Sequence, residues 1–72
     1  MARIATSRIY KEPDGQYTTI TTWRDDGVDG TTLITPAQNQ TITAAINKAR
    51  DDIASVMNGM TVREGTIGMR IE

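Results

Sequence analysis

Hydrophobic and polar residues alternate along the first third of the chain in a pattern that predicts a β-hairpin. Residues 16–24 place successive side chains on opposite faces of a strand. A less regular strand is predicted over residues 3–10. Between them, residues 12–15 read Glu-Pro-Asp-Gly. This order suits a tight turn, because proline presets φ and glycine accepts a positive φ, so we expect two antiparallel strands joined there.

The middle of the chain changes to the spacing of an amphipathic helix. Thr35 and Pro36 followed by Gln38 match a helix start, with an N-cap, a proline at the first position and a capping box. The pattern predicts a helix over residues 36–58 that ends at Gly59. Its apolar stripe contains Ile42, Ala45, Ile46, Ala49, Ile53, Val56, Met57 and Met60. A single apolar face predicts packing against a sheet on one side only.

Two shorter segments complete the predicted sheet. Residues 31–34 are expected to form a short third strand, and residues 66–71 a last one in which Ile67, Met69 and Ile71 alternate. The order β-β-(β)-α-β predicts an α+β fold, a small antiparallel sheet of three to four strands with one helix packed across one face. Because one helix does not cover the whole width of such a sheet, we expect part of it to remain open for a partner.

Length and composition limit the classes of function. The 72 residues are expected to form one domain, 1–72, which buries only about 60% of its unfolded surface. The chain has no Cys and no His, which removes disulfides, thiolate metal sites and the usual general base near neutral pH. A metal site made of carboxylates alone stays open, and association with another copy or with a partner is the favoured way to reinforce so small a core. The net charge of −1 argues against a general nucleic-acid coat protein.

No set of residues matches a known catalytic or metal-binding arrangement. Residues 25–30 contain three aspartates and resemble the start of a calcium-binding loop. Counted from Asp25, however, Gly27 and Pro36 occupy the third and twelfth positions, where an EF-hand loop needs oxygen ligands. We interpret this segment as a solvated loop. The sequence therefore predicts no enzyme, no cofactor and no metal. It has no stretch apolar enough to span a membrane and no apolar run of signal-peptide type at its start, so we expect a cytoplasmic protein of the producing or host cell.

A few strand residues are candidates for binding a partner or ligand: Tyr17, Ile20, Trp23, Arg24, Arg63 and Arg70. Trp, Tyr and Arg are enriched at the energetic centres of interfaces, although a single Trp is also a natural core residue. Arginines suit forked recognition of phosphate, or else they keep strand edges soluble. Strand parity turns Arg3 and Arg8 to opposite faces, so the strand arginines are not expected to share one surface.

The sequence leads to three functional hypotheses. The first is a non-enzymatic binding protein that acts as a homo-oligomer on a macromolecular partner, such as a virus- or mobile-element-type accessory or inhibitor. The second is a binder of an anionic small ligand (a nucleotide) or of single-stranded nucleic acid through the strand arginines. The third is a structural assembly subunit whose last strand, residues 66–71, adds to the sheet edge of a neighbour.

Overall fold

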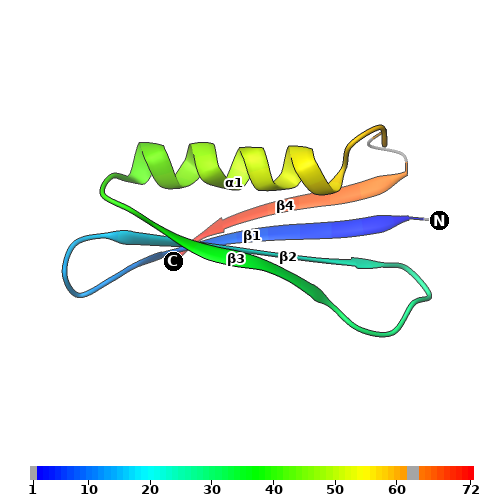
Figure 1. Ribbon diagram of the computed structural model, residues 1–72, viewed down its shortest axis with the longest axis horizontal. Coiled ribbons are helices and arrows are strands. Elements are labelled where there is room, and N and C mark those ends of the chain that lie inside the picture. The colour runs from blue at the N-terminus through cyan, green and yellow to red at the C-terminus, as the bar shows by residue number, and fades with distance from the viewer. Residues whose placement is uncertain (1, 62–63) are drawn as a thin grey trace.

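The computed structural model describes residues 2–61 and 64–72. In chain order its elements are β1 (Arg3–Lys11), β2 (Tyr17–Asp25), β3 (Thr32–Asn39), α1 (Ile42–Val56) and β4 (Gly65–Ile71). The strands form one sheet in the order β3-β2-β1-β4, and α1 lies along one face of it (Figure 1). The predicted α+β class and the single helix packed across one face are confirmed.

The first two strands form the predicted hairpin. β1 and β2 pair antiparallel from Arg3 opposite Asp25 to Lys11 opposite Tyr17. At the turn, the Gly15 N–H donates to the Glu12 carbonyl oxygen at 3.0 Å, and Gly15 has the positive φ, 86°, that its position requires. The turn chemistry read from residues 12–15 is therefore the chemistry that closes the hairpin.

The helix begins later than predicted. Thr35 and Pro36 lie within β3, and the N-cap of α1 is Thr41, whose Oγ1 accepts a hydrogen bond from Ala44 N at 3.1 Å. The predicted start was wrong because a helix over residues 36–41 would leave the first residues of β2 paired with β1 alone, with no strand on their other side. Pro36 is tolerated because β3 is an edge strand whose register with β2 shifts at this point.

The last strand runs parallel to β1, so the sheet is mixed. The predicted antiparallel pairing holds for β1, β2 and β3 but is wrong for β4. After β3 ends, α1 carries the chain back along the length of the sheet (Figure 1). β4 therefore starts at the same end as β1 and pairs with it from Arg3 opposite Gly65 to Ile9 opposite Ile71. A crossover through a helix is the usual way in which a chain reaches a parallel position.

The core lies between α1 and the two central strands. One cluster contains Ala5, Ile53, Val56 and Met57, and the other contains Ile9, Ala45 and Ala49. Ala45 and Ala49 are fully buried, and their small size lets the helix approach the sheet so closely that Thr19 Oγ1 donates to the Ala45 carbonyl oxygen at 3.0 Å. The predicted apolar stripe of the helix is confirmed, and Ala45 and Ala49 pack in the core between α1 and the sheet.

Candidate functional site

The candidate aromatic residues and their strand neighbours lie on two different faces. Tyr17 and Trp23 are half-buried on the helix side, where Trp23 packs against the cluster around Ile53 and Tyr17 against the cluster around Ile9. By strand alternation, Ile20 and Arg24 lie on the face without the helix. The structure therefore does not bring these four residues into one patch. Arg63 lies outside the described residues.

Trp23 is part of a cluster that joins the hairpin to the end of the helix. The Arg3 guanidinium lies over the Trp23 ring, 4.1 Å from its centroid, and Arg3 Nε lies 2.7 Å from Asp25 Oδ1. Arg3 Nη1 also donates to the Val56 carbonyl oxygen at 2.8 Å. The hydrogen bond from Arg3 lowers the pKa of Asp25, and the same bond raises the pKa of Arg3. Arg3 is committed to these contacts, so the cluster is structural.

Among the described residues, three arginines lie on the sheet face without the helix: Arg8, Arg24 and Arg70. Arg8 and Arg70 are direct neighbours in the register of β1 and β4, and both are exposed. Arg70 Nε lies 2.9 Å from Glu72 Oε1, and Arg24 Nη1 lies 4.0 Å from Asp26 Oδ1. Two of the three charges thus have acidic neighbours. The hollow beside Arg24 measures only about 130 Å³, less than an ordinary ligand pocket.

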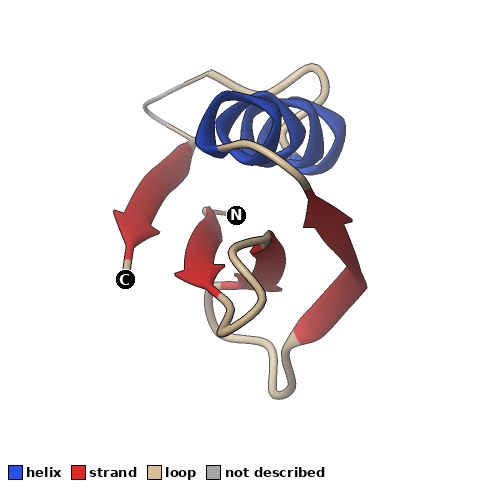
Figure 2. Ribbon diagram, turned by 90° about the vertical axis from the view of Figure 1, so that its left-hand side faces the viewer, coloured by secondary structure: helices blue, strands red, loops and turns tan. Residues whose placement is uncertain are grey.

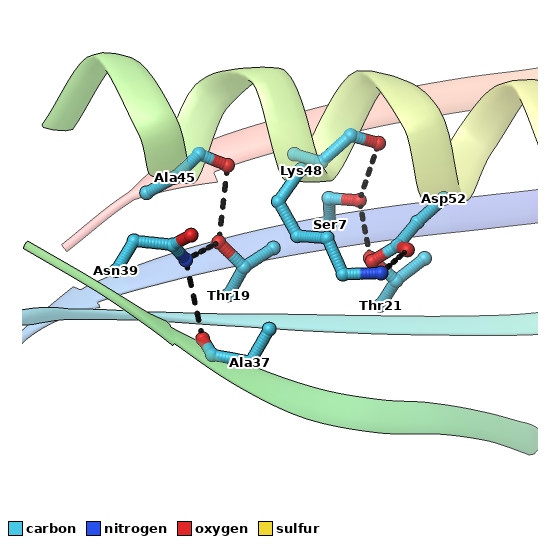
Figure 3. Close-up of polar contacts among 9 residues, drawn as sticks. Ser7, Thr19, Thr21, Ala37, Asn39, Ala45, Lys48 and Asp52 are labelled. Carbon is cyan, nitrogen blue, oxygen red and sulfur yellow. Dashed lines mark hydrogen bonds and ion pairs between the residues drawn. The ribbon is translucent and has the colours of Figure 1, made fainter. Parts of the chain in front are cut away.

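The most concentrated polar cluster is buried beneath the helix (Figure 3). Thr21 Oγ1 donates to Asp52 Oδ2 at 2.7 Å, and Lys48 donates to the other carboxylate oxygen. Since Thr21 has only one hydroxyl proton, Ser7 Oγ must be the donor in its 2.7 Å contact with Thr21 Oγ1. Ser7 is fully buried and Asp52 is only 4% exposed, whereas the Lys48 side chain is 36% exposed, so the cluster reaches solvent only through Lys48. It holds α1 on the sheet.

The side chains of β4 differ from those of β1 next to them. Ile67, Met69 and Ile71 occupy the same face as Ala5, Ser7 and Ile9, their register partners on β1. The β1 residues are fully buried under α1, whereas the β4 residues are 50%, 42% and 58% exposed. Figure 2 shows why, since β4 forms the rim of a curved sheet and runs away from the helix, which packs against β1, β2 and β3.

The outer edge of β4 also presents backbone hydrogen-bonding groups. Glu72 exchanges hydrogen bonds with β1, donating to the Ile9 carbonyl oxygen at 2.7 Å and accepting from Lys11 N at 3.2 Å. Because alternate residues of a strand direct these groups to opposite sides, Ile67, Met69 and Ile71 direct theirs away from β1. Within the described part of the chain, no strand pairs with this edge. We call these three side chains and the edge beside them the β4 surface.

The alternation of Ile67, Met69 and Ile71 was visible in the sequence, but their exposure was not.

Among the described residues, no group of three or more acidic side chains is placed to hold a metal ion. In the same residues, no helix is both long and apolar enough to cross a membrane. No protein-family model, curated protein or solved structure matches the chain. The β4 surface is therefore judged by its geometry alone.

Proposed function

We propose that the protein is a non-enzymatic interaction protein whose β4 surface binds another protein chain by strand addition. The observation that carries this proposal is the coincidence of three exposed apolar side chains with outward-directed backbone groups on one edge strand. An added strand would satisfy the backbone groups, and its side chains would cover Ile67, Met69 and Ile71. Covering each half-exposed side chain contributes roughly 1 kcal/mol.

The position of the polar residues supports a role without catalysis. The cluster around Asp52 combines a carboxylate, an ammonium and two hydroxyl groups, which are the groups that catalysis uses. Burial beneath α1 separates the hydroxyl and carboxylate groups from solvent, and the hydroxyl groups are committed to one another and to the carboxylate. The β4 surface, in contrast, is open to solvent and presents apolar side chains and backbone groups.

Native mass spectrometry of the protein after gentle purification from its producing cells tests the proposal. We expect a species heavier than the 7.9 kDa chain by the mass of at least one further protein chain. Ile71→Lys should lose that added mass, because it places a charge in the covered surface. Val28→Lys, a similarly exposed apolar position in the loop after β2, should retain it. A bare chain at every concentration, with the Ile71 variant unchanged, would contradict the proposal.

A second candidate function rests on the two neighbouring arginines of the other face. Arg8 lies directly opposite Arg70 in the β1–β4 register, where like charges destabilise a sheet, and Glu72 is the acidic neighbour of Arg70, so a further anion beside Arg8 would reduce the repulsion. Binding of a nucleotide or of a single-stranded oligonucleotide would supply that anion. We would then expect affinity for a labelled oligonucleotide that falls with added salt and is lost in Arg8→Ala. Binding that is absent or independent of salt would remove this candidate.

A further inference from the structure

The outward-directed residues of β4 have a palindromic order. Ile67, Met69 and Ile71 read Ile-Met-Ile in either direction, and all three combine an exposed side chain with outward backbone groups. A second β4 strand in the antiparallel orientation therefore presents the same pattern to the first. We infer that the chain that completes the β4 surface is a second copy of this protein, joined β4 to β4 about a twofold axis at Met69. This inference rests on the proposed function and names its partner.

Backbone hydrogen bonding and apolar side-chain pairing together favour this register. With the axis at Met69, this residue faces its own equivalent, and Ile67 faces Ile71 of the second copy. All of these residues direct their N–H and C=O groups outward, so the pairs exchange about six backbone hydrogen bonds. An axis at Gly68 would place Ile71 opposite Gly65 instead. The Gly65 N–H already donates to the Thr61 carbonyl oxygen at 3.1 Å, so that register makes about as many backbone hydrogen bonds but leaves Ile71 facing a glycine instead of an isoleucine.

The charges on the opposite face of β4 fit the same register. Arg70 lies opposite Gly68 of the second copy, where the missing side chain leaves room for the long guanidinium group. The two Arg70 residues are then diagonal neighbours across the axis. Each Arg70 already lies 2.9 Å from the Glu72 of its own chain, so the Arg70 charge at the interface is balanced within each copy. The like-charge repulsion that would oppose this pairing is thereby reduced.

The two sheet edges explain why assembly stops at two copies. Joining β4 to β4 makes one continuous sheet of both chains and leaves a β3 strand at each outer edge. β3 contains Pro36, which has no N–H, and its register with β2 is irregular there. Such an edge is a poor template for another strand. The twofold pairing is therefore closed, as expected for an isologous interface, and it reinforces a small core.

A single-cysteine variant tests the register directly, because the chain has no Cys of its own. In Met69→Cys the two sulfur-bearing residues face each other across the axis. Their Cα atoms lie about 5.5 Å apart in a hydrogen-bonded antiparallel pair, which is within the range of a disulfide. Under mild oxidation of a dilute sample, we expect most of the protein to become a covalent dimer. Leu33→Cys, at a more exposed position on β3, should form at least tenfold less covalent dimer.

Sedimentation equilibrium of the wild type and of Met69→Lys completes the test. We expect twice the 7.9 kDa mass for the wild type and a dissociation constant raised at least tenfold in the variant. Circular dichroism should show the same helix signal in both, since Met69 is exposed in the single chain. A monomer that binds a different protein would overturn this inference and leave the proposed function intact. A dimer in which Met69→Cys crosslinks no faster than Leu33→Cys would place the interface elsewhere and overturn it as well.

Discussion

β3 and β4 are the two edges of one sheet, yet they are built in opposite ways. β3 carries Pro36, has an irregular register with β2 and is contacted by α1. β4 pairs regularly with β1 over its seven residues and leaves its apolar side chains exposed. Proline and irregular pairing are devices that prevent the addition of further strands. The comparison shows one edge with features that oppose strand addition and one edge without them, and the helix packs against the former.

The largest expected effect separates two isoleucines that are partners in one register. Ile9→Ala should lower the free energy of unfolding by about 3 kcal/mol, because Ile9 is fully buried and its loss leaves a cavity. Ile71→Ala, on the neighbouring strand, should change the free energy of unfolding of the dilute protein by less than about 0.5 kcal/mol. Urea denaturation measures both. Similar losses in the two variants would mean that β4 is also covered within the single chain.

A smaller effect on stability is expected from the buried hydroxyl groups. Thr21→Val keeps the volume of the side chain but removes the hydroxyl that lies between Ser7 and Asp52. We expect a loss of about 2 kcal/mol in the free energy of unfolding, since a buried carboxylate oxygen loses its donor. Thr22→Val, the next residue on the opposite face, is the matched control and should change stability by less than about 0.5 kcal/mol.

A proline introduced into β4 should oppose the addition of a further strand, as Pro36 does in β3. The N–H of Met69 is directed away from β1, so Met69→Pro removes a donor only from the outer edge of the sheet. We expect association measured by sedimentation to weaken at least tenfold, about 1.4 kcal/mol, while the helix signal is retained. Gly68→Pro should instead destabilise the fold, because the N–H of Gly68 is directed toward β1. If Met69→Pro associates like the wild type, the edge of β4 is not the interface.

The smallest expected effect concerns acid stability at the end of the hairpin. The hydrogen bond from Arg3 lowers the pKa of Asp25 below its usual range. A carboxyl group with a lowered pKa in the folded state contributes stability above its unfolded pKa, and this contribution disappears as the pH falls through the folded pKa. Asp25→Asn should therefore reduce the loss of thermal stability on acidification, with exposed Asp26→Asn as the control. An unchanged acid profile in Asp25→Asn would show that this ion pair does not contribute.

Much of the fold could be predicted because its signals are local. The Glu12–Gly15 turn, the alternation of β2 and the apolar stripe of the helix each depend on residues close together in sequence, and all three are confirmed. The predicted start of the helix was wrong because two residues, Thr35 and Thr41, can each serve as an N-cap. Thr35 was preferred for its neighbouring proline, but pairing with β2 makes residues 35–39 a strand and leaves Thr41 as the cap.

The binding residues were harder to predict than the elements. Parity correctly separated Tyr17 and Trp23 from Ile20, but it could not show which face the helix would cover. Arg70 is a binding candidate because of its charge. The structure pairs it with Glu72, and the exposed apolar side chains of the same strand form the β4 surface.

Local sequence signals are enough to specify the hairpin, the amphipathic helix and the alternating last strand, because turns, caps and side-chain periodicity act over a few residues. The parallel direction of β4 and its position beyond the helix are specified only in the complete fold. That choice depends on contacts between residues about sixty positions apart, such as Arg3 with Gly65, and on the limited width that one helix can cover. The same three apolar residues that would be core under a wider helix are here left as a surface.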